Sequence, residues 1–448
     1  MEFVPRDVAF AVSKIANFNS NAYRLETNGA TSASPNGIIT ITLPSASVID
    51  LRSFKVHMDV TTTADTTTAA NTVFGKLPSD ASSLIAQCEV YCGGIQISQG
   101  FSEFNTVSKV KKLVHSSRDR ESSIDQTLSH GIITTTDAVD DVSVIFKPHI
   151  GLFAESSTRY LPTSLTGDIS VRLTLASNAV LTYKEVTVGM PGSFSGANAR
   201  AAALNVSYSV ANIHATCAVC TLGDLYESLL LDRLTQEEFL SVNVKEYYTF
   251  SLHGTSSTAH DVRFSLSASS IDRIYTVMRD ANYQTPGIRT REYPGAALTD
   301  ANCSNFFFFK SFNSSNTKTG ALKYHHTVNN VRHPQYDGDC LDAAHELTMI
   351  SDSQGLTGRG NMITTLTDWN QGKAIVPLQL QMPGQPVNVQ SGYHSKGNTT
   401  QFSVSLSGLT LPAANATTQV SAALSTLVIV ETTAQLRIQG AKQCAVAY

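Results

Sequence analysis

Residues 82–107 read SSLIAQCEVYCGGIQISQGFSEFNTV. On either side of Gly93 and Gly94, apolar residues alternate with polar ones. Two short runs with a period of two, joined by Gly-Gly, predict a tight β-hairpin, because the central residues of such a turn need the positive φ angles that glycine adopts readily. The residues after it, 101–114, predict a helical or irregular segment that leaves the sheet. No catalytic group lies in this stretch, so its information concerns the fold.

Similar alternating runs lie on both sides of this hairpin. Residues 37–44 (GIITITLP) and 53–60 (SFKVHMDV) predict two strands before it, followed by a low-complexity Thr/Ala loop at residues 61–72. Further strands are expected at residues 142–148, 168–175, 180–188, 204–210, 213–222, 243–252, 262–266, 305–312, 322–331, 401–406, 424–431 and 434–438. Short strands separated by turn signals, with few helices, predict β-sandwiches rather than alternating β-α units.

A few segments have helical spacing instead. Residues 224–238 and 341–350 predict helices. Residues 269–278 also space their apolar side chains as a helix would, although an extended segment fits them too. Residues 109–126 form the densest charge run of the chain, and they predict a solvent-exposed loop or helix.

Composition limits the classes of function. Of the 448 residues, 42% are hydrophobic and only 15% are charged, with Ser, Thr and Asn filling many polar positions. Such a chain suits strands, turns and large protein–protein contacts, and it does not suit disorder. The formal net charge is −4, and the charges of residues 1–26 balance. We therefore expect no direct sequence-specific binding of nucleic acid, because that affinity comes from clustered Lys and Arg.

Sequence signals for export are not found. Residues 1–14 lack the basic start and apolar core of a signal peptide, and no apolar run approaches the length of a membrane span. The protein is therefore expected to be made in the cytosol. The seven cysteines are expected to be reduced thiols there.

The expected domain organisation has four parts. Residues 1–26 form an N-terminal arm, residues 27–190 a first sandwich, residues 191–203 a Gly- and Ser-rich linker, and residues 204–448 a second sandwich. Within the arm, apolar residues at close to helical spacing predict a short amphipathic helix. This helix either packs on the chain's own base or contacts an inner partner, through Val8, Val12, Ile15 and Phe18.

The cysteine pairs do not predict a metal or redox site. Cys217 and Cys220 form a CxxC motif, but they lie in a predicted strand, where residues three apart face opposite sides. Cys88 and Cys92 share a strand face, but four residues along a strand span roughly 13 Å, too far for a direct bridge.

Other candidates for chemistry are also weak. His325, His326, His333 and His345 lie close in sequence, yet no HExxH or paired CxxC frame organises them into a metal site. The glycine loop at residues 355–361 lacks the context of a phosphate-binding loop, and no acid/base pair can be nominated. We therefore expect no catalytic residue, no metal and no cofactor, and surface or interface roles for the histidines.

The order of these segments resembles a known family. It is similar to the double jelly-roll major capsid proteins of double-stranded DNA viruses, a group that includes polinton-like viruses, virophages, adenoviruses and large DNA viruses. The resemblance covers most of the chain in order. It is carried by residues 37–60, residues 83–107 with Gly94 and Asn105, residues 322–350 (LKYHHTVNNVRHPQYDGDCLDAAHELTMI) and residues 424–438 (LSTLVIVETTAQLRI). Cys92-Gly93-Gly94 stands where the family often has Asn-Gly.

The resemblance implies an all-β chain of two consecutive eight-stranded jelly-roll sandwiches with short helices in the loops. It implies a structural, non-enzymatic protein that forms homotrimers of pseudo-hexameric outline, which tile an icosahedral virion shell beside neighbouring trimers. Penton proteins, minor capsid proteins or an inner membrane reached through the arm would be the other partners. The protein would be made in the host cytoplasm and assembled in the host cell. Residues 61–72 and 287–301 would form exposed towers.

A second class of function remains open at this point. A two-sandwich protein that binds or cleaves carbohydrate needs exposed aromatic platforms and, for catalysis, paired carboxylates. The chain has one tryptophan, Trp369, and no evident acid pair. A cellular adhesin or fibre module is a third option, and the missing signal peptide counts against it.

Overall fold

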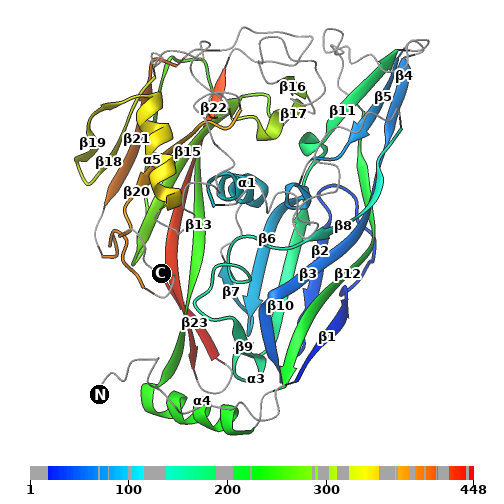
Figure 1. Cartoon of the computed structure of the whole chain (residues 1–448), viewed down its shortest axis with the longest axis vertical. Helices are drawn as coiled ribbons and strands as arrows, with labels where there is room; N and C mark the ends of the chain where they lie inside the picture. Colours follow the sequence, from blue (N-terminus) through cyan, green and yellow to red (C-terminus); the bar gives the residue numbers. More distant parts are fainter. Residues whose placement is uncertain are drawn as a thin grey trace.

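The structure, a computed structural model, consists of two β-sandwiches that stand side by side with their long strands along one axis (Figure 1). It describes residues 19–68, 71–78, 80–98, 103–115, 138–187, 205–221, 224–284, 288–290, 302–309, 322–352, 369, 372–382, 389–397, 400–409, 411, 423–439 and 443–448. The expected arm helix, the linker and the glycine loop lie outside the described residues, namely Val8, Val12, Ile15, Phe18, residues 191–203 and residues 355–361.

The first sandwich is built from the sheets β1-β12-β3-β8 and β2-β10-β6-β7. Their strands are Asn19–Glu26 (β1), Tyr208–Thr221 (β12), Val48–Thr62 (β3), Asp141–Phe146 (β8), Ile38–Thr42 (β2), Ile169–Leu175 (β10), Ile85–Cys92 (β6) and Ile95–Ser98 (β7), with Tyr160–Pro162 (β9) also on β3. Along β2, β10 and residues 54–62 of β3 every second side chain is buried, because one face of each strand meets the core. The alternation predicted for residues 53–60 is confirmed.

The second sandwich repeats this design with the sheets β13-β22-β15-β20 and β14-β21-β18-β19. Its strands are Phe239–Thr255 (β13), Leu424–Gln439 (β22), Ile271–Asp280 (β15), Ile375–Gln379 (β20), Ala259–Ser265 (β14), Gln401–Ser407 (β21), Lys323–Val328 (β18) and Val331–Gly338 (β19), with Gln443–Ala447 (β23) paired to β22. One continuous hydrophobic core runs through both sandwiches. The expected all-β double jelly roll is confirmed.

The Gly-Gly hairpin forms as predicted. Strand β6 ends at Cys92, and β7 begins at Ile95. Gly93 and Gly94 have φ angles of 56° and 84°. A Cβ on Gly94 would meet nothing within 4 Å, so its positive φ, rather than crowding, is the reason for glycine there.

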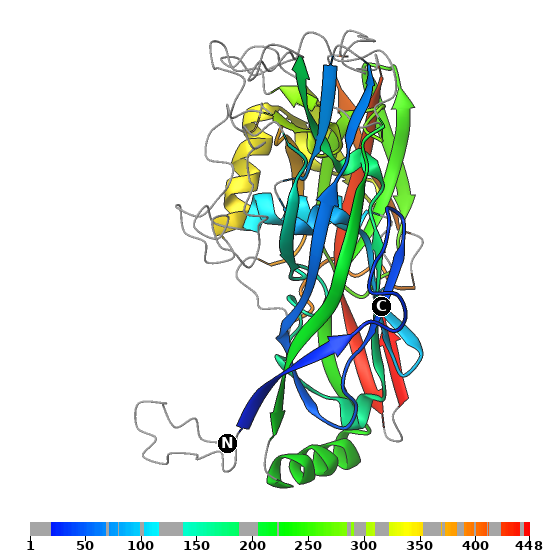
Figure 2. The same cartoon turned by 90° about the vertical axis from the view of Figure 1, so that its right-hand side faces the viewer.

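The two ends of the molecule differ. At one end a small sheet joins Ala64–Thr68 (β4), Asn71–Lys76 (β5) and Thr182–Thr187 (β11), and a short ribbon joins Ile288–Thr290 (β16) to Asn302–Ser304 (β17). At the opposite end lies the helix Asp224–Glu237 (α4), which confirms the helix predicted there (Figure 1). Figure 2 shows that β1 starts near the α4 end, and its first residue, Asn19, pairs with Thr221 of β12.

The sandwich boundary predicted from sequence is too early. Strand β12 pairs with β1 and β3, so it belongs to the first sandwich although it lies beyond residue 204. Residues 19–26 are likewise a sheet strand rather than part of an arm. The boundary between the sandwiches was placed at residues 191–203 because of their Gly- and Ser-rich composition. Backbone pairing instead places this boundary between β12 and α4.

Of the two alternatives for residues 269–278, the extended one is correct, because strand β15 begins at Ile271 and all ten of its residues are buried. Two local expectations were wrong. Residues 305–307 form a 3₁₀ helix rather than a strand, although Phe306, Phe307 and Phe309 are buried as expected. The Thr/Ala segment 61–72 is mostly strand, as β3 continues to Thr62 and β4 and β5 follow.

Candidate functional site

The helix Phe104–His115 (α1) lies between the two sandwiches. It packs on β6 and on the 3₁₀ helix Ala81–Leu84 of the first sandwich, and on the helix Cys340–Asp352 (α5) of the second. Its apolar side chains are all at most 2% exposed, namely Phe104, Val107, Val110, Leu113 and Val114. Two of its lysines, Lys111 and Lys112, are also buried, with 3% and 7% exposed.

The charge run 109–126 is therefore not a solvent-exposed face in its described part. This prediction was wrong because α1 lies between two sandwiches. Its lysines are paired with buried carboxylates of these sandwiches instead of with water. Residues 116–126 lie outside the described residues.

The start of α1 is tied to strand β15. The Arg279 Nη2 atom donates to both carboxylate oxygens of Glu103, at 2.7 Å and 2.6 Å, and its Nη1 donates to Thr106 Oγ1 at 3.2 Å. The guanidinium lies 3.5 Å from the ring centroid of Tyr283 and 4.9 Å from that of Phe306. Arg279 thus holds the second sandwich to the first through charge, hydrogen bonds and ring stacking.

The middle of α1 carries a lysine to each sandwich. Lys111 Nζ lies 2.9 Å from Glu431 Oε2 in β22 and 3.3 Å from Glu155 Oε1. One residue later, Lys112 Nζ reaches Asp80 of the first sandwich at 2.5 Å. Adjacent residues on a helix point about 100° apart, so Lys112 turns to the first sandwich alone, whereas Lys111 reaches carboxylates of both sandwiches.

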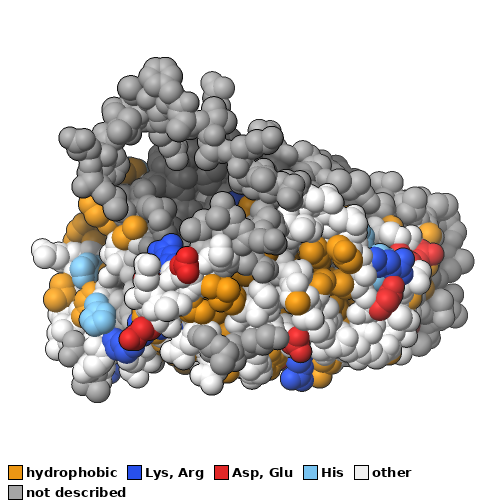
Figure 3. All heavy atoms as spheres, turned by 90° about the horizontal axis from the view of Figure 1, so that it is seen from below, with side chains coloured by type: hydrophobic (Ala, Val, Ile, Leu, Met, Phe, Trp, Pro, Cys, Tyr) orange, Lys and Arg blue, Asp and Glu red, His pale blue; other side chains and the backbone are white. Residues whose placement is uncertain are grey.

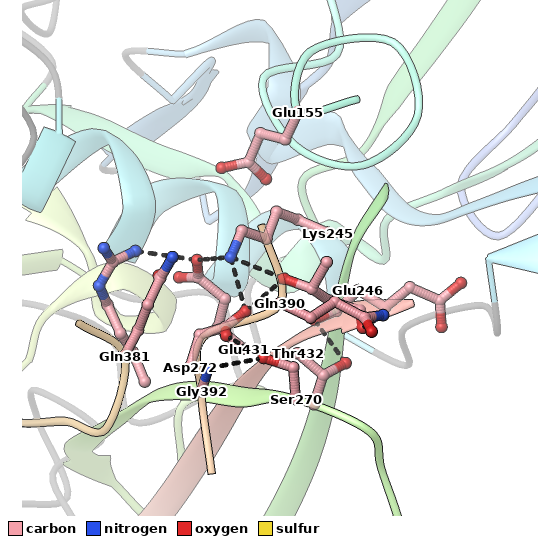
Figure 4. Close-up of polar contacts among 12 residues, drawn as sticks. Glu155, Lys245, Glu246, Ser270, Asp272, Gln381, Gln390, Gly392, Glu431 and Thr432 are labelled. Atoms are coloured by element: carbon pink, nitrogen blue, oxygen red, sulfur yellow. Dashed lines mark hydrogen bonds and ion pairs between the residues drawn. The ribbon is translucent and has the colours of Figure 1, made fainter. Parts of the chain in front are cut away.

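Glu431 is the centre of a buried charge cluster. Besides Lys111, it accepts from Arg273 Nη1 at 2.9 Å and lies 3.5 Å from Lys245 Nζ. Lys245 also donates to Asp272 Oδ2 at 2.6 Å (Figure 4). With Glu155, the cluster holds three cations and three anions, so its formal charge is zero. We name Lys111, Glu155, Lys245, Asp272, Arg273 and Glu431 the inter-sandwich cluster.

The pKa shifts around this cluster follow from burial and its charges. Burial, helped by the negative charges of Glu155 and Glu431, raises the pKa of Tyr247. Its hydroxyl therefore stays protonated and donates to Glu155 Oε2 at 2.5 Å. Burial is the largest influence on the pKa of Arg273 and lowers it, but Glu431 together with Tyr275, Tyr247 and Asp272 outweighs burial and raises that pKa. Arg273 accordingly keeps its positive charge inside the protein.

Backbone hydrogen bonds close the same interface. The Ser157 N–H donates to the Asn243 carbonyl at 2.8 Å, and the Lys245 N–H donates to the Glu155 carbonyl at 3.1 Å. Residues 155–157 of the first sandwich thus add a short bridge to strand β13 of the second. Together with α1, these hydrogen bonds join the two sandwiches into one structural unit.

One apolar surface is exposed on the second sandwich. Strand β19 is an edge strand, and α5 follows it directly. Four large side chains there are about half exposed, namely Val331 (52%), Tyr336 (57%), Leu341 (49%) and Met349 (55%). We name these four residues the β19–α5 patch. Large exposed apolar side chains on an edge strand and on the helix that follows it are typical of a protein–protein contact.

The four histidines that lie close in sequence are separated by the fold, and the surface role expected for them is wrong for His326. His326 of β18 faces His333 of β19 in register and is 1% exposed, His325 hydrogen-bonds Arg332, and His345 lies on the outer side of α5. Among the described residues, no three His, Cys, Asp or Glu side chains are placed to hold a metal ion. The described part of the chain also contains no helix long and apolar enough to cross a membrane.

The buried His326 is expected to make stability depend on pH. Burial, with help from the charges of His325 and His333, lowers the pKa of His326 to about 3. An unfolded histidine has a pKa near 6.5, so below that pH only the unfolded state binds the proton, and stability falls by about 2 kcal/mol between pH 6.5 and 5. Other groups titrate in the same range and are common to both proteins, so the loss is measured by denaturation as a difference: between pH 6.5 and 5 the wild type should lose about 2 kcal/mol more stability than His326→Leu.

The matched control is His394→Leu, since His394 is exposed. That variant should keep the wild-type difference between the two pH values. Equal pH dependence in the wild type and in His326→Leu would contradict this role of His326.

The remaining candidates are buried in the core. Cys217 and Cys220 lie in strand β12, as predicted, and are 1% and 3% exposed. Trp369 is fully buried, and its Nε1 donates to the Ile375 carbonyl at 3.0 Å. It therefore cannot serve as an exposed platform for a sugar ring.

The comparisons with solved structures identify the fold. PBCV-1 VP54 fitted into a cryo-EM reconstruction of the virophage Sputnik is 12% identical, with a TM-score of 0.62 and 99% of both chains covered. The PBCV-1 virus capsid is 13% identical, with a TM-score of 0.61 and 99% of both chains covered. The Faustovirus major capsid protein is 10% identical, with a TM-score of 0.54, covering 96% of this chain and 92% of that one. No protein-family model and no curated protein matches the sequence.

Proposed function

We propose that this protein is a major capsid protein, whose homotrimers of pseudo-hexameric outline tile the shell of an icosahedral virion. The observation that carries the proposal is the match of the whole chain, both sandwiches and their relative placement, to a capsid chain of PBCV-1 over 99% of both. A match of one sandwich alone would support only a common fold, because sandwiches serve many functions.

The buried interface explains how one chain can act as a tile. The inter-sandwich cluster and α1 fix two similar blocks side by side, so three chains would present six blocks around one axis. Near-hexagonal tiles cover a facet with few kinds of contact, and a closed shell needs repeated contacts of this kind. Rigid coupling matters because a hinge between the blocks would let the outline vary from one copy to the next.

The two ends would face different surroundings. The small sheet of β4, β5 and β11 and the ribbon of β16 and β17 lie at one end, and these would form the outer towers. At the other end, β1 begins opposite Thr221, close to α4. The arm that carries Val8, Val12, Ile15 and Phe18 would there contact minor capsid proteins, penton proteins or an inner membrane.

The surface supports a structural role rather than catalysis. Seen from below (Figure 3), uncharged and hydrophobic side chains cover most of the described surface, and charged ones are sparse. This face, with few charges, suits contact with another protein. The glycan-binding alternative loses the one tryptophan as an aromatic platform, because Trp369 is buried.

The purified chain is expected to run as a trimer in size-exclusion chromatography with light scattering, at about three times 48.1 kDa. We expect the β19–α5 patch to lie in the contact between copies, so Met349→Asp should weaken the trimer at least about ten-fold, because it buries an unpaired charge. Leu231→Asp on α4, also half exposed, is the matched control and should leave the trimer intact.

A wild-type chain that stays monomeric at tens of micromolar, and shows no hexagonal outline by negative-stain microscopy, would overturn the proposed function. A trimer unaffected by Met349→Asp would instead exclude this patch as the contact.

A further inference from the structure

Two cysteines from different sandwiches meet beside the short helix Thr163–Thr166 (α3). Cys92 ends strand β6, and Cys444 lies in β23, 352 residues later in the chain. Their Sγ atoms are 3.2 Å apart, and both face the Thr166 carbonyl oxygen, at 3.5 Å and 3.6 Å. Cys92 is fully buried, and Cys444 is 5% exposed.

We propose that Cys92 and Cys444 form a reversible disulfide that joins the first sandwich covalently to strand β23 of the second. A disulfide has an S–S distance of about 2.05 Å, so the two sulfurs have only about 1 Å left to close. Both residues are held in register by neighbouring strands, Cys92 opposite Ile169 and Cys444 opposite Ile438. The sulfurs therefore stay near each other without ordering a loop first.

The other described cysteines do not offer this arrangement. Cys88 shares the face of β6 with Cys92, but the strand keeps the two roughly 13 Å apart. Burial raises the pKa of Cys88 to about 12, which leaves it as an inert thiol. A hydrogen bond from Cys92 lowers the pKa of Cys444 instead, so Cys444 is the better nucleophile of the pair.

The reaction is a thiol–disulfide exchange with a small-molecule disulfide as the oxidant. The Cys444 thiolate attacks one sulfur of that disulfide and releases the first small thiol. The Cys92 thiolate then attacks the Cys444 sulfur and releases the second. The two protons lost by the cysteines end on the two released thiols, and the two electrons reduce the oxidant. Strand β23 is five residues long and pairs at the sheet edge, so its opening can admit the oxidant.

The bond would respond to the redox state of the surroundings. In the reducing cytosol the pair would stay as thiols, and in an oxidising extracellular medium it would close. The passage of the protein from the cytosol to the virion rests on the proposed function, but the formation of the disulfide does not. Its formation can be measured on the chain whether or not the chain assembles.

The test is oxidation of the full-length protein with oxidised glutathione, both on the native protein and during refolding from denaturant, where access to the thiols is not limiting. Peptide mapping should find Cys92 linked to Cys444, with two of the seven thiols lost. Non-reducing electrophoresis should show faster migration, because the link closes a loop of over 300 residues, and the unfolding temperature should rise by several degrees. Dithiothreitol should reverse all three changes.

Cys92→Ser should lose the linked peptide and the faster band, whereas Cys88→Ser, in the same strand and also buried, should keep both. Oxidation that yields only glutathione adducts, or a different cysteine pair, in both arms would overturn the proposal. A monomeric protein that still forms the Cys92–Cys444 link would contradict the capsid proposal and leave this one standing.

Discussion

Glu431→Gln is expected to lower the free energy of unfolding by about 3–5 kcal/mol, because it leaves buried cations without their central anion. Glu431 is fully buried and contacts Lys111, Lys245 and Arg273 within 3.5 Å. After the substitution, three buried cations would share two carboxylates, those of Glu155 and Asp272. Glutamine keeps the shape of the side chain, so the loss measures charge rather than packing.

Chemical denaturation provides the measurement. Because Glu431 links α1 to the second sandwich, the variant should also separate one unfolding transition into two, as the sandwiches lose their coupling. The matched control is Glu237→Gln on α4, where the same change removes an exposed pair with Arg233. Exposed pairs contribute about 0–1 kcal/mol, so that variant should stay near the wild type.

A double variant tests whether the lost stability comes from the unbalanced charge of the cluster. Adding Lys111→Met to Glu431→Gln restores balance, leaving two cations and two anions, so it should recover part of the lost stability. Loss of less than about 1 kcal/mol in Glu431→Gln, with a single transition, would show that the cluster does not couple the sandwiches.

Much of the fold follows from local pattern. Strands such as β3 and β10 turn one face to the core and the other away from it. Their apolar residues therefore alternate, and this alternation predicts the strands from the sequence. The Gly93-Gly94 turn is equally local, because its positive φ angles limit the residues that fit. Helix α5 was predicted from its own 3.6-residue spacing.

The errors and the one ambiguous segment arise where an element is buried by two neighbours or pairs with a distant strand. Strand β15 is buried on both faces, so Ile271, Ile274 and Val277 show no alternation, and their three-residue spacing resembles a helix. Strand β12 comes after the linker-like segment, but it pairs back onto β3. Such non-local pairing leaves no mark in the composition of the strand itself.

The partners within the site lie far apart in the chain, so local patterns give little sign of it. Lys111 and Glu431 are 320 residues apart in the chain, and Cys92 and Cys444 are 352 apart. A charge run within a segment that also carries Val107, Val110 and Val114 at helical spacing was the one available indication. Those apolar residues indicate a packed helix, and charged side chains on a packed helix need partners.

Arg279→Ala is expected to be the second most damaging substitution, with a loss of about 3–5 kcal/mol, because it leaves Glu103 unpaired at the interface. It also removes the cation stacked on Tyr283 and Phe306 and leaves a cavity beside those rings. Arg279 is 1% exposed, so little water can enter to compensate. The start of α1 should detach first, and hydrogen exchange at Thr106 and Val107 should accelerate.

Arg279→Lys distinguishes charge from geometry. Lysine keeps the positive charge, but it cannot donate in a fork to Glu103 and Thr106 or stack flat on Tyr283, so it should recover only part of the loss. Arg263→Ala is the matched control, because Arg263 pairs with Asp261 at the surface with 80% of its side chain exposed. If Arg279→Ala and Arg263→Ala lowered the denaturation midpoint equally, the Arg279 contacts would add nothing to the coupling. If Arg279→Lys matched the wild type, charge alone would hold α1 to β15.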